Sequence, residues 1–142
     1  MKLVVTIPYT IYGVPVDAQT RVSLAANQTR RLGYSTNPHR RRLVRQAEEQ
    51  LRHDAAIATL YAMQGATERR PTRPFHDVTP IRVEILVSIK TARTRDADGC
   101  IAGLKIGFDA IAQALGVDDS RFQMGEVTFV KGDPETRLTL EA

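Results

Sequence analysis

Apolar residues recur along the chain in two different spacings. The clearest alternation runs over residues 81–90, where every second residue is an isoleucine or a valine, and it predicts a strand with one buried face. Shorter β-branched runs predict strands over residues 3–7, 124–130 and 137–140. The Lys-Gly-Asp-Pro-Glu stretch at 131–135 predicts a turn, so we expect the last two strands to form a C-terminal β-hairpin or an edge of the same sheet.

Two longer stretches have the spacing of amphipathic helices. Asn37 and Pro38 supply a cap and a first helical residue, and the pattern continues to about Met63. Asp96 and Asp98 lie at the entrance of the second helix, which ends before Gly116, a residue that suits the left-handed position after a helix. The order strand, helix, strand, helix, strand, strand predicts an α+β fold. We expect a single domain over residues 1–142, with a mixed β-sheet and two main helices packed on it.

Acidic residues gather in the stretch 93–119, around the second helix. They are Asp96, Asp98, Asp109, Asp118 and Asp119. At about 100° per residue, Asp98, Lys105 and Asp109 share a helix face away from the apolar stripe. Oxygen ligands suit Mg²⁺, and clustered carboxylates on an arginine-rich chain are typical of metal-dependent phosphodiesterases. Each acid also has an ordinary interpretation, as a helix cap or as a turn residue.

Charge is divided unevenly along the 142 residues, whose net charge is +4. Residues 1–76 hold 12 Lys/Arg and 5 Asp/Glu, a net +7, whereas residues 77–142 hold 8 and 11, a net −3. Four arginines crowd the start of the first helix, where the helix dipole disfavours positive charge by a few tenths of a kcal/mol each. They are Arg40, Arg41, Arg42 and Arg45. This placement favours contact with phosphate, and a solvated basic face is the alternative.

The composition indicates where the protein is located and which reactions its cysteine can undergo. An apolar fraction of 42% and a charged fraction of 25% are ordinary for a soluble globular protein. No apolar run is long enough to span a membrane, and the first residues do not have the pattern of a signal peptide. We therefore expect a cytoplasmic location. Cys100 is the only cysteine, so no disulfide forms within the chain.

Several motifs together resemble the RusA-type Holliday junction resolvases, small endonucleases typical of phages and prophages. They are Arg-Asp-Ala-Asp at 95–98, a lysine on the following helix face, Phe-Asp-Ala-Ile at 108–111 and Leu-Gly-Val-Asp-Asp at 115–119. The closing Val-Thr-Phe-Val-Lys-Gly and Arg-Leu-Thr-Leu are similar to the end of the family's sequence. The resemblance covers about the last 60 residues and is weak over residues 9–75.

The resemblance implies roles for individual residues. Asp96, Asp98 and Asp119 match metal-binding aspartates, and Lys105 matches a catalytic lysine. Asp118 is a further candidate acid. Two arginines just ahead of the acids are placed to meet phosphate, and these are Arg93 and Arg95. The metal would be Mg²⁺, with Mn²⁺ as a substitute.

The activity implied is magnesium-dependent cutting of four-way (Holliday) DNA junctions by paired nicks, in DNA recombination and repair. Family members act as homodimers on branched DNA and have no membrane partner; a phage-encoded member would work in the host cytoplasm. Two departures stand out: Gly99 replaces an asparagine found in many members, and Lys105 follows Asp98 by two helical turns, where some members have one. Two alternatives stay open, namely a DNA-binding protein of the same fold without activity and a nuclease for flaps or other branched DNA. The metal-site hypothesis requires Asp119 to approach Asp96 and Asp98 in the folded chain.

Overall fold

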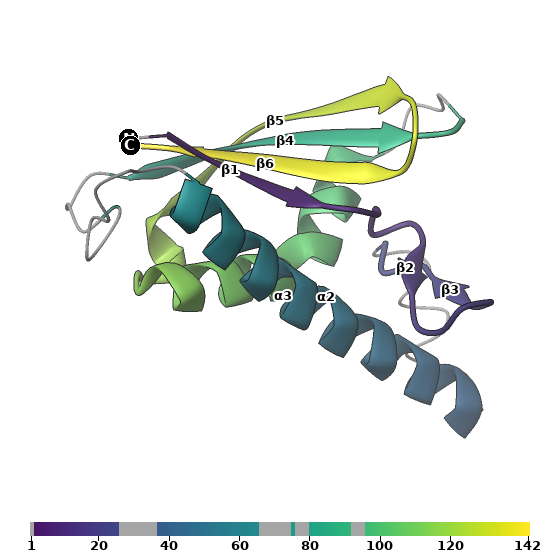
Figure 1. Ribbon diagram of the computed structural model, residues 1–142. Helices are drawn as coiled ribbons and strands as arrows, with labels where there is room; N and C mark the ends of the chain where they lie inside the picture. Colours follow the sequence, from purple (N-terminus) through teal and green to yellow (C-terminus); the bar gives the residue numbers. More distant parts are fainter. Residues whose placement is uncertain (1, 26–36, 66–74, 76–79, 92–95) are drawn as a thin grey trace.

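A four-stranded mixed sheet carries two long helices on one of its faces (Figure 1). The computed structural model describes residues 2–25, 37–65, 75, 80–91 and 96–142. The elements are β1 (Lys2–Ile7), β2 (Val14–Pro15), β3 (Arg21–Val22), α2 (Pro38–Gly65), β4 (Ile81–Ile89), α3 (Ala97–Leu115), η1 (Asp119–Arg121), β5 (Phe122–Lys131) and β6 (Glu135–Glu141). The predicted α+β class, with a mixed sheet and two main helices, is confirmed.

The strand order in the sheet is β1-β6-β4-β5, with β5 parallel to β4 and the other pairs antiparallel. Both C-terminal strands exist as predicted, but β4 lies between them, so they flank β4 instead of pairing with each other. The short connection crosses the end of β4, where the Gly132 N–H donates to the Ile89 carbonyl at 2.9 Å. A Cβ at Gly132 would lie 2.7 Å from Ser88 Oγ, so a larger residue here would require the Ser88 hydroxyl to move. The turn between β5 and β6 therefore crosses the end of β4.

The core lies between the sheet and the helices. In β4 the predicted alternation is confirmed, since the five residues at odd positions from Ile81 to Ile89 are all at most 4% exposed. The two helices pack side by side, and Gly107 of α3 brings its backbone against Leu51 and Ala55 of α2. The rings of Phe108 and Phe122 meet edge to face, with centroids 6.4 Å apart. This packing holds α3 beside α2 on the sheet and leaves one stripe of α3 facing solvent.

Both helix starts and the end of α3 follow the predicted signals. The Asn37 side chain accepts a hydrogen bond from the His39 N–H at 3.0 Å, just ahead of Pro38. Asp96 caps α3, and Gly116 ends it in the left-handed conformation with φ 72°, its N–H donating to the carbonyls of the last turn. Neither helix in the described part of the chain is long and apolar enough to cross a membrane.

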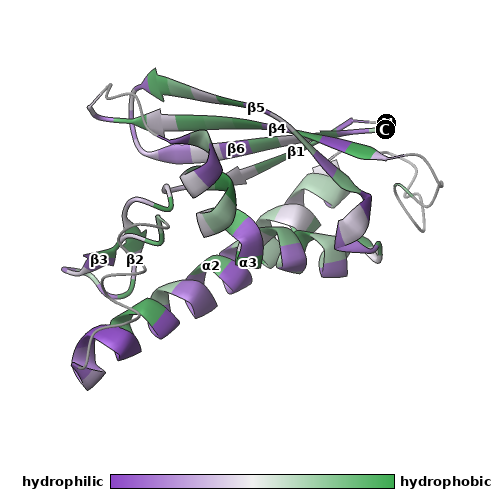
Figure 2. Ribbon diagram, turned by 180° about the vertical axis from the view of Figure 1, so that it is seen from behind, coloured by the Kyte–Doolittle hydropathy of each residue, from purple (hydrophilic) through white to green (hydrophobic). Residues whose placement is uncertain are grey.

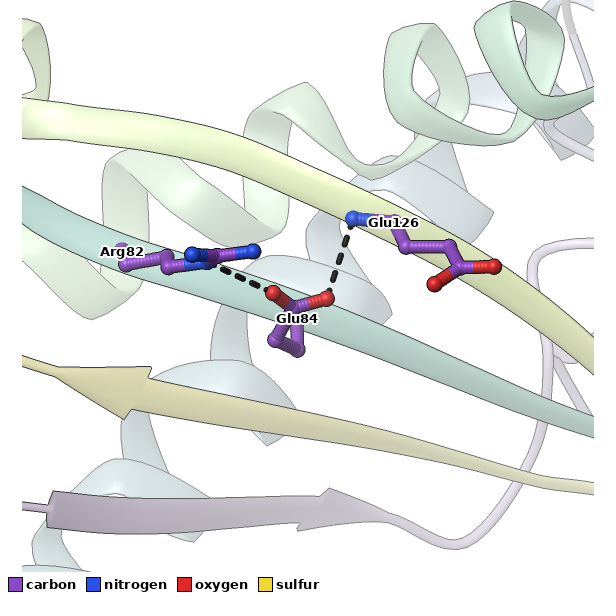
Figure 3. A network of polar contacts seen from close by, with 3 residues as sticks. All are labelled: Arg82, Glu84 and Glu126. Atoms are coloured by element: carbon purple, nitrogen blue, oxygen red, sulfur yellow. Dashed lines mark hydrogen bonds and ion pairs between the residues drawn. The ribbon is translucent and has the colours of Figure 1, made fainter.

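The sheet face opposite the helices carries polar side chains. In this face β5 has an irregularity in its register with β4, at Gly125 and Glu126. The Glu84 carboxylate accepts hydrogen bonds from the Glu126 N–H at 3.0 Å and from Arg82 Nε at 2.7 Å (Figure 3). A Cβ at Gly125 would lie 2.6 Å from the same carboxylate. Glu84 thus satisfies the backbone N–H that the irregular pairing releases.

Two glycines of α3 should respond oppositely to alanine. At Gly103 a Cβ would lie 2.7 Å from the Leu24 carbonyl oxygen and 2.6 Å from the Ile11 side chain, so backbone would have to move. We expect Gly103→Ala to lower the free energy of unfolding by about 1–3 kcal/mol. At Gly107 the nearest atoms are 3.7 Å away, so Gly107→Ala should be neutral or stabilise by about 0.5–1 kcal/mol. Urea unfolding of both variants checks this, and equal losses would contradict it.

Candidate functional site

Two aspartates meet at the C-terminal end of α3. Asp119 opens η1 and lies beside Asp109, close enough for their carboxyl groups to share a hydrogen bond. This hydrogen bond is the main cause that raises the pKa of Asp119, ahead of desolvation and of repulsion by Asp109 and Asp118. The acids border an open hollow of about 310 Å³ together with Ala112 and Val117. Two exposed carboxyl groups in this position either share a proton or attract a cation.

Asp118 has a structural role in the same turn. Its carboxylate accepts a hydrogen bond from the Ser120 N–H at 2.9 Å and caps η1. That bond holds the pKa of Asp118 below its usual range. Asp118 is therefore charged whenever its neighbour Asp119 is charged, which adds to the negative potential of the hollow. Asp118 can therefore be both a turn residue and an additional acid of the site.

The other predicted acids lie at the opposite end of α3. Asp96 caps the helix, and its carboxylate accepts a hydrogen bond from the Asp98 N–H at 3.1 Å. Asp98 follows in the first turn with an exposed side chain. A Cβ at Gly99 would lie 3.3 Å from Asp96 Oδ2, so the glycine leaves this oxygen less crowded than an asparagine would. Asp96 thus combines the ordinary capping role with an open second oxygen.

A single chain does not bring the two ends together. From Asp98 to Asp109 the unbroken helix rises over eleven residues, which is about 16 Å at 1.5 Å per residue. The required approach of Asp119 to Asp96 and Asp98 is therefore not found within one chain, because a rigid helix separates them. Among the residues that the structure describes, no group of three or more His, Cys, Asp or Glu could hold a metal ion.

One exposed stripe of α3 joins the two acidic ends. We call it the α3 stripe, and its members are Asp98, Ala102, Lys105, Asp109 and Gln113. At about 100° per residue these side chains fall within roughly 80° of one another. Lys105 lies one turn before Asp109, and no ion pair within the described ranges involves it. The predicted common face of Asp98, Lys105 and Asp109 is therefore an exposed surface running the length of α3.

The basic start of α2 projects away from the sheet. Its four arginines, Arg40, Arg41, Arg42 and Arg45, are all exposed. Figure 2 shows this end of α2 as a hydrophilic segment beyond the body of the molecule. The first turn carries no acidic residue that would neutralise it. Arg93 and Arg95, the other predicted phosphate contacts, lie outside the described residues.

A larger hollow between β1 and α2 has a different character. Its volume is about 470 Å³, and its lining is mainly apolar, including Val4, Ile57 and Tyr61. Its one carboxylate, Asp54, already accepts hydrogen bonds from the Tyr9 hydroxyl at 2.5 Å and from Gln50 at 2.9 Å. Burial and this contact raise the pKa of Tyr9. The hollow therefore offers little to a metal ion or a phosphate.

Cys100 is poorly placed to bind a metal ion. Its side chain is fully buried in the first turns of α3. Burial raises the pKa of its thiol to about 11, against a weaker opposite effect of Tyr12. A thiol binds metal as the thiolate, so this cysteine is a small core residue at neutral pH.

Asp109 is the residue that sequence reasoning undervalued. The helical spacing predicted that Asp109 shares a helix face with Asp98 and Lys105. Asp109 was not one of the predicted metal ligands. Its partner Asp119 lies ten residues later, beyond the end of the helix, so no helical spacing links the two. The available signal was the Asp118–Asp119 pair directly after a helix-ending glycine, which turns the chain back toward the last helical turns.

Replacing Asp109 should reveal the contact in solution. In Asp109→Asn the nearby charge disappears, and the amide can donate a hydrogen bond to the ionised carboxylate of Asp119. We expect the pKa of Asp119 to fall toward the ordinary aspartate range, so that the carboxyl loses its proton at lower pH than in the wild type. A carboxyl-detected NMR titration measures this pKa directly. An unchanged titration of Asp119 would show that the two groups are apart in solution.

Comparison of the chain with known protein families and with characterised proteins finds no match. The resemblance to RusA-type resolvases therefore depends on the motifs themselves, above all Asp-x-Asp, Lys105 and the Asp118–Asp119 pair. The established facts are the α+β fold, an exposed basic helix start, and acidic groups at both ends of α3.

Proposed function

We propose that this protein is a magnesium-dependent DNA endonuclease of the RusA type, which resolves four-way junctions by paired nicks as a homodimer. The observation that supports this most is the pairing of Asp109 with Asp119, a predicted metal ligand. Exposed carboxyl groups gain nothing from being held together unless a proton or a cation joins them. Mg²⁺ binds through a few carboxylate oxygens and retains several waters, which fits an open acidic hollow.

Different residues of the chain have different proposed roles in phosphodiester hydrolysis. Asp96, Asp98 and Asp119 are the proposed ligands, and Asp109 joins them on the evidence of its contact with Asp119. A divalent cation, when bound, supplies an activated water and stabilises negative charge on the phosphate. The Lys105 ammonium would neutralise charge that develops on the phosphate oxygens. Each cut adds one water across one P–O bond and leaves a phosphate end and a hydroxyl end.

The basic start of α2 is the proposed contact for the DNA backbone. Its exposed arginines can neutralise phosphates, so binding should weaken steeply with salt. Arg93 and Arg95, just ahead of Asp96, would add contacts close to the acids. Recombination and repair of DNA are the processes that need such an activity, and the host cytoplasm is the proposed location of a phage-encoded enzyme.

A second candidate is a DNA-binding protein of this fold without catalytic activity. It is favoured by one finding, that no complete group of three metal ligands occurs within the described part of a single chain. Against it stand acids that would repel bound phosphate without serving any purpose in binding. A nuclease for flaps or other branched DNA is a third candidate, and it would use the same residues.

The proposal is tested with three labelled substrates, a four-way junction, a flap and a linear duplex of the same sequence. Each is incubated with the protein in Mg²⁺, in Mn²⁺ and in EDTA. We expect symmetric nicks in the junction with either metal and none in EDTA. Binding to the junction without nicks in any metal would select the non-enzymatic candidate. Equal cutting of the flap would select the broader nuclease.

A further inference from the structure

The strand β1 leaves one edge of the sheet open. In the part of the chain that the structure describes, β1 pairs with β6 on one side and with no strand on the other. Its register with β6 is unbroken from Lys2 to Ile7, and its only charged residue is Lys2, at the first position. Every second residue of a strand directs its N–H and C=O groups toward the same side. The outer side of β1 therefore presents a row of backbone donors and acceptors, which a further strand can use.

The opposite edge of the sheet is protected against such pairing. There β5 has its irregular register at Gly125 and Glu126, which interrupts the regular ladder. The charged side chains of Glu126 and Lys131 are exposed along the same strand. Irregular register and charged residues are common means of preventing an edge strand from pairing with another chain. Of the two edges, β1 is therefore the one that can accept a strand.

The C-terminal half of α2 lies next to β1 and forms a wall beside its open edge (Figure 1). Residues at helical spacing on α2 border the hollow of about 470 Å³, and they are Asp54, Ile57, Ala58, Tyr61 and Ala62. This stripe is distinct from the buried stripe of the same helix, which packs in the core. Tyr61 is 72% exposed and Ile57 is 41% exposed. Large apolar side chains exposed beside an unpaired strand edge indicate an interaction surface.

One carboxylate oxygen in this hollow is left for a further donor. Both hydrogen bonds to Asp54, from the Tyr9 hydroxyl and from Gln50, end on Oδ2. Oδ1 accepts no hydrogen bond from the residues that the structure describes. Among the described residues that line the hollow there is no lysine or arginine. A basic side chain in the bound molecule is therefore complementary in charge to Asp54.

We infer that β1 and α2 bind an extended segment of a partner protein, which adds a fifth strand to the sheet at the free edge of β1. The backbone of the segment pairs with β1, and its side chains alternate between the two faces of the enlarged sheet. Side chains on the helix face cover Ile57 and Tyr61, so apolar residues are required at every second position. A basic residue near one end of the segment meets Asp54. This surface shares no residue with the proposed nuclease site.

The size of the hollow favours a single extended chain over other occupants. Two turns of an α-helix, 10–12 Å across, occupy roughly 850 Å³ or more. The hollow is smaller than that, and a helix would also leave the backbone groups of β1 without partners. A second copy joined through β1 would bring its own α2 to the same face, because the twofold axis between antiparallel edge strands is perpendicular to the sheet. The hollow has no room for that helix.

A selection from random peptides tests strand addition without a known partner. The probe is a display library of random ten-residue peptides, selected on the full chain. We expect the enriched sequences to have apolar residues at every second position and a lysine or an arginine near one end. Enriched sequences with apolar residues at helical spacing would overturn the inference. Enrichment no greater than on beads without the protein would also overturn it.

Substitutions in α2 then test where the most enriched peptide binds. Tyr61→Ala and Ile57→Ala should each raise its dissociation constant at least about tenfold, because each removes apolar contact. Leu60→Ala is the matched control, since Leu60 is an exposed apolar residue of the same helix that does not line the hollow. Its dissociation constant should stay within about twofold of the wild-type value. Fluorescence anisotropy measures binding, circular dichroism confirms folding, and equal effects of all three substitutions would contradict the assigned surface.

The contact with Asp54 has its own test. Asp54→Asn should weaken binding of the enriched peptide at least about threefold, because the carboxylate charge is lost. It should leave unchanged the binding of a version in which alanine replaces the basic residue. An equal loss for the two peptides would overturn the role of Asp54 in recognition.

Amide hydrogen exchange distinguishes strand addition from other modes of binding. In the peptide complex, slower exchange should appear at every second residue of β1, because those N–H groups point away from β6. Slower exchange confined to α2 would show that the peptide binds the helix without adding a strand, which overturns the inference. If the outward amides of β1 are already protected in the chain alone and lose that protection on dilution, a second copy occupies the edge, and a partner segment is the wrong occupant.

Discussion

Asp119→Asn should abolish Mg²⁺-dependent nicking of a four-way junction, with a rate at least about 100-fold below the wild type. Residues that only orient a metal ligand are worth about 10- to 100-fold, so the loss of a direct ligand should exceed that range. The substitution removes one negative charge beside Asp109 and keeps nearly the same shape. Single-turnover cleavage of a labelled junction measures the rate, and Asp98→Asn should show a loss of the same size.

Binding separates a catalytic role from a role in DNA affinity. Asp119→Asn removes a charge that repels phosphate, so the affinity for the junction should be unchanged or slightly higher. A matched control is Asp133→Asn, which makes the same change at an exposed aspartate between β5 and β6 and should retain full activity. Wild-type rates in Asp119→Asn would remove Asp119 from the site.

Leu51→Ala should have the largest effect on stability among simple truncations of α2. Leu51 is 1% exposed and lies against Gly107 of α3. Removing its side chain forfeits the burial of apolar surface and leaves a cavity that two packed helices cannot readily close. We expect the free energy of unfolding to fall by about 2–5 kcal/mol. Urea unfolding at 25 °C, followed by circular dichroism, measures this loss.

Leu60→Ala is the control for this truncation. Leu60 lies in the same helix, nine residues further on, and is 46% exposed. Its removal should change the free energy of unfolding by less than about 1 kcal/mol, because much of the side chain is already in water. Equal losses at the two positions would mean that α2 does not pack on α3 in the way described.

Most elements of the fold could be predicted from local signals. The alternation in β4 and the helical spacing in α3 each reflect one buried face, and a period is visible in the sequence. Asn37, Pro38 and Gly116 act within their own helix turns, so they could also be predicted. The arrangement of the last two strands could not be, because Lys-Gly-Asp-Pro-Glu has the composition of a hairpin turn, and only the position of β4 decides what the turn crosses.

In the candidate site, too, local features could be predicted from the sequence and contacts between distant residues could not. Helical spacing predicted that Asp98, Lys105 and Asp109 share a face, and all three side chains are exposed in the α3 stripe. The motif resemblance implied that Asp119 joins Asp96 and Asp98, but it says nothing about which chain supplies each acid. The length of α3 excludes that meeting within one chain, and only a structure shows that Asp119 contacts Asp109 instead.

Metal-dependent cutting of DNA is the central claim, and one time course tests it most directly. The wild-type protein is bound to an end-labelled four-way junction in EDTA, and an excess of Mg²⁺ is then added. We predict that paired nicks, placed symmetrically across the junction, appear only after the addition. A junction that stays bound and intact in Mg²⁺ and in Mn²⁺ would contradict the account.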